Sequence, residues 1–182
     1  SKSGPHASTG TFEEVARFGE LLVLAVKGDV AEEALRLAGT ANFAGKTLID
    51  VTNPLAFNAG GAPHLFVGLD DSLAERIQRL VPDAHVVKAF NSVGNAHFFR
   101  PDFPGGPPDM FICGNDAGAK TKVGDIVEAF GWSVIDVGGI DGARTLEPIS
   151  ILWVNSALRL GTWDLALKFL RKGTPNPPAA RP

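Results

Sequence analysis

The chain has 182 residues, of which 45% are hydrophobic, and a formal net charge of −3. This length suits one domain, or one domain with an extension, and the apolar content is sufficient for a buried core. The slightly acidic charge offers no basic surface for nucleic acid, and no apolar run has the length of a membrane span, so we expect neither partner. Cys113 is the only cysteine and the four histidines lie far apart, which excludes an internal disulfide and a multi-cysteine zinc site and favours a reducing cytoplasm.

Five short apolar runs, taken in chain order, predict five β-strands. The runs are Leu21–Val26, Thr47–Thr52, His85–Phe90, Asp109–Gly114 and Ser133–Gly138. Each run is continuous rather than alternating, which is typical of parallel strands that are covered on both faces.

Helical patterns lie between several of these runs, which predicts a doubly wound, mostly parallel α/β sheet. Asp29, Asp71 and Asp116 stand where N-cap residues are expected. The three helical patterns cover Asp29–Ala38, Ser72–Leu80 and Ala117–Phe130.

After the last strand the pattern becomes helical up to about Lys172, with a kink or restart near Pro148. We therefore divide the chain into a sheet domain (1–140), a C-terminal helical extension (141–172) and a tail (173–182). The tail is rich in proline and buries nothing, so it is expected to be disordered.

The residues that follow the five strands are small, polar and turn-forming. In open parallel sheets ligands bind beyond the carboxyl ends of the strands, where such residues let a flat ligand approach the backbone. Five such tips together favour a ligand site, and a large cofactor could lie across the sheet at Lys27-Gly28. The alternative is that Gly and Asn only close the turns. Two loops rich in glycine and proline, Ala56–Pro63 and Arg100–Pro108, could border this site.

Lys88 is a charged residue inside an apolar run. A buried unpaired charge is costly, so Lys88 needs a partner or a position at the open end of the sheet. Asp50, in another apolar run, is the candidate partner. The alternative is that Lys88 contacts a cofactor.

A few other side chains have both a structural and a functional interpretation. His97 is the only histidine near the proposed site and could serve proton transfer. Arg144 and Glu147 are three residues apart on a predicted helix, so they share a face and could form an ordinary helical pair. Trp153 and Trp163 indicate packing of the extension or a dimer interface.

The chain contains no G-x-S-x-G elbow, Walker loop, HExxH motif or paired His/Cys ligand spacing, so covalent and metal-assisted hydrolysis are not indicated. Hydride transfer between two bound cofactors needs no protein nucleophile, because the proximity and orientation of the reacting carbons supply much of the rate. A site of backbone and small residues is compatible with that chemistry, and no side chain is predicted as an acid or a base.

Four longer segments are similar to segments of a known protein family. They are LIDVTNPL (48–55), VVKAFNSVGN (86–95), MFICGNDAGAK (110–120) and FGWSVIDVGGIDGARTLEP (130–148). In order and spacing they resemble the coenzyme F420-dependent NADP oxidoreductase family and, more distantly, the cytosolic reductase domain of the six-transmembrane ferric reductases. The resemblance covers roughly Gly10 to Lys172. It implies a Rossmann domain that holds NADP(H), with a second flat cofactor, F420 or a flavin, stacked on the nicotinamide.

We assign three sets of site residues on this basis. The residues expected along the dinucleotide are Ala25, Val26, Lys27, Gly28, Asn53 and Pro54. Those expected beside the nicotinamide are Lys88, Ala89, Phe90 and Asn91. Those expected towards the second cofactor are Val93, Gly94, His97, Arg144 and Glu147.

The start of the chain departs from the family. Family members begin with a strand, a G-x-G-x-x-G turn, a helix and a second strand, whereas this chain begins with Ser and contains no G-x-G-x-x-G. We therefore expect an incomplete chain in which the first Rossmann strands are missing. Their absence would weaken dinucleotide binding and leave an apolar sheet edge that invites dimerisation.

The sequence thus predicts an oxidoreductase that transfers a hydride between NADP(H) and F420 or a flavin, as a homodimer. Two alternatives stay open. One is a non-catalytic fragment or interaction module that retains the sheet. The other is an NADPH-dependent reductase of a small carbonyl or imine, for which the chain has no tyrosine as proton donor, although His97 or Lys88 could serve.

Overall fold

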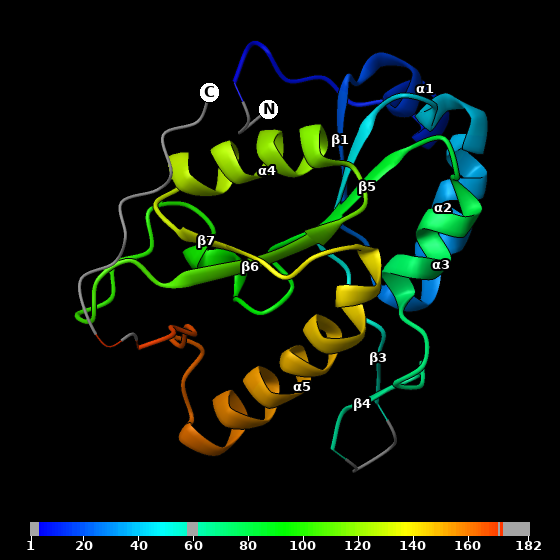
Figure 1. Cartoon of the computed structure of the whole chain (residues 1–182). Helices are drawn as coiled ribbons and strands as arrows, with labels where there is room; N and C mark the ends of the chain where they lie inside the picture. Colours follow the sequence, from blue (N-terminus) through cyan, green and yellow to red (C-terminus); the bar gives the residue numbers. More distant parts are fainter. Residues whose placement is uncertain (1–3, 58–61, 171, 173–182) are drawn as a thin grey trace.

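The computed structural model describes residues 4–57, 62–170 and 172, and its centre is a five-stranded sheet (Figure 1). The strands are β1 Leu21–Leu24, β2 Thr47–Asp50, β3 Leu55–Ala56, β4 His64–Leu65, β5 His85–Lys88, β6 Asp109–Gly114 and β7 Ser133–Asp136. The main sheet has the order β1-β2-β5-β6-β7, and β3 and β4 form a separate two-stranded sheet. All five predicted strands are present, and each except β6 ends before its predicted end.

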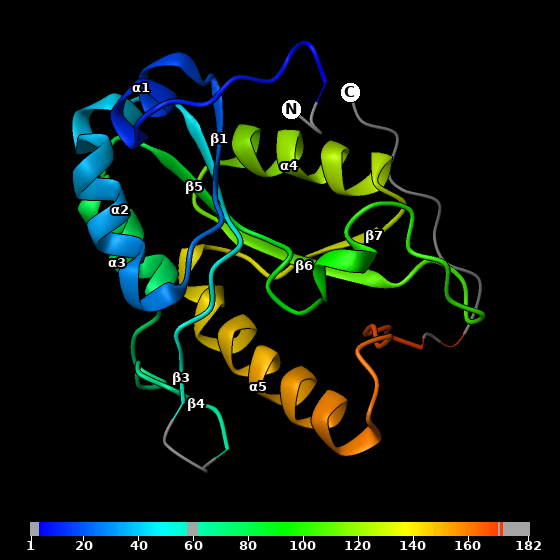
Figure 2. The ribbon, with the colours of Figure 1, turned by 180° about the vertical axis from the view of Figure 1, so that it is seen from behind.

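Helices cover both faces of the main sheet (Figures 1 and 2). They are α1 Phe12–Phe18, α2 Ala31–Ala38, α3 Leu73–Leu80, α4 Ala117–Ala129 and α5 Ala143–Leu160. Successive strand residues point to opposite faces. Val86 accordingly belongs to the core under α2, α3 and α5, and Val87 to the core under α4. Two cores, one on each face, explain why the strands are apolar without alternation.

The predicted fold class is confirmed. β1, β2 and β5 are parallel, and α2 and α3 make the crossovers between them, as in a Rossmann-like doubly wound sheet. The C-terminal helix α5 lies against the same sheet, where Ala143 and Leu146 enter the first core.

β6 and β7 run opposite to the other three strands. β5 pairs antiparallel with β6, and β7 is parallel to β6. A parallel neighbour needs a long crossover, usually a helix, but the connection from β5 to β6 holds only the short 3-10 turn Asn95–His97. The prediction of five tips around one site was therefore wrong. The tips after β1, β2 and β5 share one edge, and the tips after β6 and β7 lie at the other.

The helix α1 was not predicted from the sequence. The hydroxyl of Thr11 accepts from the backbone of Glu14, and the side chain of Glu14 accepts from the backbone of Thr11, which forms a capping box. Ala16 is buried against the first core. The spacing Thr-x-x-Glu was a usable signal, since it is typical of a helix start.

One of the three predicted N-caps is confirmed. Asp116 caps α4. α3 is capped by Ser72 rather than by Asp71, because the hydroxyl of Ser72 reaches the third amide of the helix. α2 has no side-chain cap hydrogen bond, since Asp29 lies within the 3-10 turn Gly28–Val30 that precedes it.

The helical extension ends earlier than predicted. α5 continues through Pro148 as one helix, without the predicted restart, at the cost of one helical N–H. It ends at Leu160, because Gly161 adopts a left-handed φ of 68°, a common helix end. The tail 173–182 that was predicted to be disordered lies outside the described residues.

Residues 162–170 form an irregular segment, which we call the C-terminal strap. The backbone N–H of Asp109, at the start of β6, donates to the carbonyl of Leu167 at 2.9 Å. The indole N–H of Trp153 in α5 donates to the carbonyl of Leu165 at 2.8 Å. These bonds hold the strap beside the part of β6 that β5 leaves unpaired.

Candidate functional site

A cleft of about 580 Å³ lies at the carboxyl ends of β1 and β2. Its lining residues are Val26, Lys27, Gly28, Asp29, Val51, Thr52, Asn53, Leu55, Ala56 and Phe57. This lining includes four of the six residues predicted along the dinucleotide, and the other two adjoin it in sequence, Ala25 being exposed and Pro54 buried. Because ligands of open α/β sheets bind at this edge, the cleft is the candidate site.

A second cleft, of about 470 Å³, lies at the opposite edge of the sheet, where β5 begins. It is lined by Gln78, Arg79, Pro82, Ala84, His85, Asn115 and Asp116. It lies away from the carboxyl ends of the parallel strands, so we assign the site to the first cleft.

Gly28 allows the tip of β1 to cross closely over the tip of β2. A Cβ atom at Gly28 would overlap the carbonyl oxygen of Asn53 and would lie 3.0 Å from a methyl carbon of Leu73. A larger residue could fit only if the β2 tip moved. Lys27, which precedes this crossing, is exposed beside the cleft.

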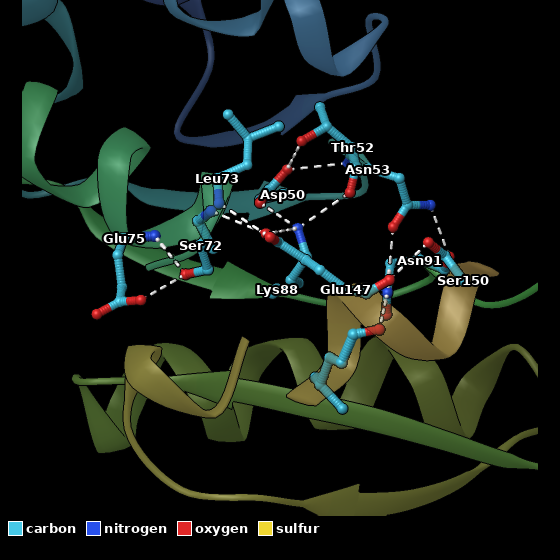
Figure 3. Close-up of polar contacts among 12 residues, drawn as sticks. Asp50, Thr52, Asn53, Ser72, Leu73, Glu75, Lys88, Asn91, Glu147 and Ser150 are labelled. Atoms are coloured by element: carbon cyan, nitrogen blue, oxygen red, sulfur yellow. Dashed lines mark hydrogen bonds and ion pairs between the residues drawn. The ribbon is translucent and has the colours of Figure 1, made fainter. Parts of the chain in front are cut away.

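Next to the cleft a buried ionic cluster joins β2, β5 and α5 (Figure 3). The ammonium of Lys88 lies 2.7 Å from a carboxylate oxygen of Asp50 and 3.2 Å from one of Glu147. It also donates to the carbonyl of Thr52 at 3.0 Å. The register of β2 and β5 places Asp50 directly beside Lys88, so the predicted ion pair is confirmed. The second carboxylate, Glu147, was not predicted as a partner of Lys88.

Both carboxylates of the cluster have further donors. The backbone N–H and the hydroxyl of Thr52 donate to Asp50 at 2.9 and 2.6 Å. The backbone N–H groups of Leu73 and Ala74, at the start of α3, donate to Glu147 at 2.9 and 3.0 Å. Buried charges persist only with such a full set of partners, so the cluster forms one connected network.

The electrostatics of the cluster keep Lys88 charged. Burial by itself would lower the pKa of Lys88, but the carboxylates of Asp50 and Glu147 outweigh burial and raise the pKa above its ordinary value. Burial raises the pKa of Glu147, against the opposing effects of the Lys88 ammonium and the α3 backbone N–H groups. Lys88 therefore remains an ammonium at neutral pH, and its side chain has no exposed surface at the cleft.

The two charged residues near the start of α5 do not form the helical pair that their spacing allowed. Arg144 binds Glu75 of α3 instead, with two hydrogen bonds of 2.6 and 2.9 Å. The carboxylate of Glu147 lies within the buried cluster, with a side-chain exposure of 1%. Each side chain thus finds a partner on another element, and only Arg144 is exposed.

The tip of β5 turns sharply out of the sheet. Ala89 is fully buried, and Phe90 has a φ of 57°, which is strained for a bulky residue. The side chain of Asn91 donates to the side chain of Asn53 at 3.2 Å and to the carbonyl of Leu146 at 2.7 Å. Asn53 in turn donates to the carbonyl of Asn91 at 2.7 Å. These amide bonds fix the β5 tip to the β2 tip and to α5.

Val93 and Gly94 continue the β5 tip towards the C-terminal strap. Val93 is partly buried against the core under α4. A Cβ atom at Gly94 would lie 3.4 Å from the ring of Trp153, whose indole is 5.3 Å from that of Trp163. The two tryptophans thus pack the end of α5 against the strap, which confirms the packing prediction, and Gly94 faces Trp153.

His97 lies on the same side of the molecule. Its Nε2 atom is 2.9 Å from a carboxylate oxygen of Asp164 in the strap, and its ring is 5.1 Å from that of Phe103. The structure therefore gives His97 a partner in the strap, and it groups Val93, Gly94 and His97 apart from the cleft of β1 and β2.

Sequence reasoning missed Glu147 as a partner of Lys88 and Asn91 as a link between tips. The available signal for Glu147 was a carboxylate in a helical stretch with Leu146 and Ile149 close in sequence, which is unusual for a solvated face. Asn91 gave no comparable signal, since asparagine after a strand also occurs in ordinary turns.

The described residues contain neither a candidate metal site nor a candidate membrane span. No group of three or more His, Cys, Asp or Glu side chains in this part of the chain could hold a metal ion. Over the same residues, no helix combines the length and apolar character needed to cross a membrane.

The chain is similar in sequence to several known proteins. Residues 1–54 match the family model described as NADP oxidoreductase coenzyme F420-dependent. The F420-dependent NADP reductase of Methanocaldococcus jannaschii is 28% identical over 164 residues, which cover 89% of this chain and 69% of that protein. Metalloreductase STEAP3 of Rattus norvegicus is 30% identical over 148 residues, and the match covers 81% of this chain and 28% of the metalloreductase.

One solved structure matches nearly the whole chain. The crystal structure from Arthrobacter sp. FB24 that is provisionally named as an F420-dependent NADP-reductase is 38% identical, with a TM-score of 0.89. The match covers 94% of this chain and 79% of that chain. The imine reductase of Bacillus cereus, at 15% identity and a TM-score of 0.56, shares the fold alone. Identity and coverage at the level of the Arthrobacter protein, together with the match at residues 1–54, show that the chain belongs to the coenzyme F420-dependent NADP oxidoreductase family.

Proposed function

We propose that the protein transfers a hydride between NADP(H) and a deazaflavin of the F420 type. The observation that carries this proposal is the cleft of about 580 Å³ at the carboxyl ends of β1 and β2, in a member of an NADP oxidoreductase family. The names of the relatives support both NADP and F420, and none of the relatives named above is described with a flavin.

The residues around the cleft fit a dinucleotide. Gly28 lets the tips of β1 and β2 cross closely without side-chain bulk, and this crossing shapes the cleft. Val26 and Phe57 offer apolar surface, and the exposed ammonium of Lys27 suits a phosphate. We assign Ala25 to Gly28, with Asn53 and Pro54, to NADP(H).

The protein contributes orientation rather than acid–base chemistry. When bound, the reduced nicotinamide supplies the hydride and the deazaflavin accepts it, or the reverse. Phe90 and Asn91 are buried, so their part is to shape the backbone of the β5 tip, where we place the nicotinamide. Holding two flat rings in contact and excluding water between them accounts for much of the rate of such a reaction.

We place the ring of the second cofactor beside Val93 and Gly94. Arg144 is nine residues before Trp153 on α5, which is about 14 Å along a helix. Since Trp153 is the residue that Gly94 faces, Arg144 would contact a part of the second cofactor distant from the ring.

The two alternatives are less well supported. A reductase of a small carbonyl or imine needs a proton donor, and both residues considered for that role are engaged, Lys88 within the buried cluster and His97 with Asp164. The non-catalytic module is tested by the binding experiment below.

The first experiment is a titration of the chain with NADPH, followed by tryptophan fluorescence, and then an assay of NADPH oxidation with F420 and separately with FMN. Saturable binding and turnover with F420 are expected. Failure of the folded chain to bind NADPH would contradict the proposal and favour the non-catalytic module. Turnover with FMN but not F420 would replace the deazaflavin by a flavin.

A matched pair of glycine variants tests the position of the site. Gly28→Ala should weaken NADPH binding strongly, because the added methyl forces the tips of β1 and β2 apart. Gly105→Ala is the control, since a Cβ atom there meets nothing within 4 Å. Equal affinities of the two variants would remove the cleft from the site. The homodimer and the cytoplasmic setting remain predictions, of which the first is tested by the molar mass in solution.

A further inference from the structure

Glu147 connects α5 with the start of α3. The first N–H groups of a helix have no partner within the helix, and the hydroxyl of Ser72 satisfies only that of Glu75. The N–H groups of Leu73 and Ala74 bond to Glu147 instead, although Glu147 is more than 70 residues away in sequence. The start of α3 is thus held in place by a residue of α5 (Figure 3).

The residues that Glu147 binds contact the lining of the cleft. Leu73 lies directly behind Gly28, at 3.0 Å from the position of a Cβ atom there. Lys88, the second partner of Glu147, donates to the carbonyl of Thr52, a residue of the cleft lining. Movement of the Glu147 carboxylate would therefore be transmitted to both walls of the cleft through direct contacts.

Leu146, the residue before Glu147, connects α5 to the tips of β5 and β2. The carbonyl of Leu146 accepts the side chain of Asn91, which also bonds to Asn53 of the cleft lining. Two consecutive residues of α5 thus fix the start of α3, the tip of β2 and the tip of β5 relative to one another.

We propose that Glu147 is a positioning residue for dinucleotide binding, which acts through Lys88 and the start of α3 without touching the ligand. The proposal rests on the proposed function, since it concerns the same cleft. It gives α5 a role in shaping the nucleotide site from outside the cleft.

The test is the variant Glu147→Gln, which keeps the shape of the side chain. Its amide nitrogen is a donor and replaces one of the two oxygen acceptors that Lys88 and the α3 N–H groups use. NADPH affinity is expected to fall about tenfold, equivalent to about 1.4 kcal/mol, while kcat with saturating NADPH changes little. Backbone hydrogen exchange in the free protein should increase at Thr52, Asn53 and Asn91.

The matched control is Asp71→Asn. It also removes a carboxylate beside the start of α3, but this carboxylate binds Arg76 and Arg79 at the surface and does not face Lys88. The control should keep the NADPH affinity and the hydrogen exchange of the parent chain. Glu147→Asp, which keeps the charge and shortens the reach, should be intermediate and serves as the test variant if Glu147→Gln does not fold.

The outcomes separate this inference from the proposed function. Binding of NADPH by the parent chain, with equal affinity in the Glu147 variants, would overturn the inference alone. The inference would also be overturned if affinity and kcat fell in proportion while hydrogen exchange at the tips stayed unchanged. Such a result would point to a catalytic rather than a positioning role. Absence of NADPH binding by the parent chain would overturn the proposed function together with the inference.

Discussion

Replacement of Lys88 by methionine gives the sharpest test of the buried cluster. Methionine keeps much of the apolar stem and removes the ammonium, and it leaves the carboxylates of Asp50 and Glu147 in place with exposures of 0% and 1%. Loss of one partner from a buried ion pair typically costs about 3–5 kcal/mol. A domain of this kind is stabilised by only about 5–15 kcal/mol in total, so the variant should lose a large share of its stability.

A second substitution should restore part of the lost free energy of unfolding. Asp50→Asn keeps an oxygen acceptor for Thr52 and removes one of the two uncompensated charges. The double variant Lys88→Met/Asp50→Asn is therefore expected to be more stable than Lys88→Met alone, with a coupling energy of roughly 0.5–3 kcal/mol. Urea unfolding, followed by circular dichroism and tryptophan fluorescence, measures both free energies. Equal losses in the single and the double variant would refute the account of the cluster.

The pH dependence of Lys88→Met provides an internal check. Burial raises the pKa of Glu147 above its ordinary value of 4.5. A carboxyl with a raised pKa in the folded state contributes stability that is fully present below about 4.5 and is lost as the pH rises through the folded value. In the parent chain the Lys88 ammonium opposes this rise, so its loss should raise the pKa of Glu147 further. The variant should therefore regain stability relative to the parent chain as the pH falls towards 4.5, and a widening gap in that direction would contradict the assignment.

Three further outcomes are expected. The pKa of Lys88 is raised above 10.5 in the folded state. The stability that Lys88 contributes should therefore be fully present below about pH 10.5 and lost as the pH rises through the folded pKa. Unfolding curves measured at alkaline pH would detect this loss. Trp153→Phe removes the hydrogen bond to Leu165 and should lower the free energy of unfolding by about 1 kcal/mol. It should also speed proteolysis within the C-terminal strap. Unchanged cleavage would show that the strap is held by other contacts. Burial raises the pKa of the Cys113 thiol to about 12, so a thiol reagent should modify it only on unfolding, and rapid modification of the folded protein would contradict its place in the core.

The strands of the main sheet could be predicted from the sequence because each is an apolar run with a polar tip. The direction of β6 could not, since an apolar run reads the same in a parallel and an antiparallel strand. The relevant signal was the connection from Phe90 to Asp109, which lacks the helix that a parallel crossover requires. A connection without that helix favours an antiparallel β6, which places the tips of β6 and β7 at the opposite edge.

Part of the candidate site could also be predicted from the sequence. Lys88 and Asp50 could be paired because each is a charge inside an apolar strand, where a partner is needed. Glu147 could not be added, since its contact with Lys88 depends on how α5 docks on the sheet. The cleft itself depends on the crossing of Gly28 over Asn53, which is a property of tertiary packing rather than of local pattern.

The bridge from Glu147 to the start of α3 also bears on the order in which the protein assembles. Its donor Leu73 is 74 residues away in sequence, and the pair of Lys88 and Asp50 spans 38 residues. The Lys88–Asp50 pair forms with the β2–β5 crossover, of which it is a register pair, whereas we expect the bond from Leu73 to Glu147, which closes the longer loop, to form later. Interactions completed after the folding transition state slow unfolding and leave the folding rate nearly unchanged. We therefore expect the Glu147 bridge to act on the lifetime of the folded cleft rather than on its rate of formation.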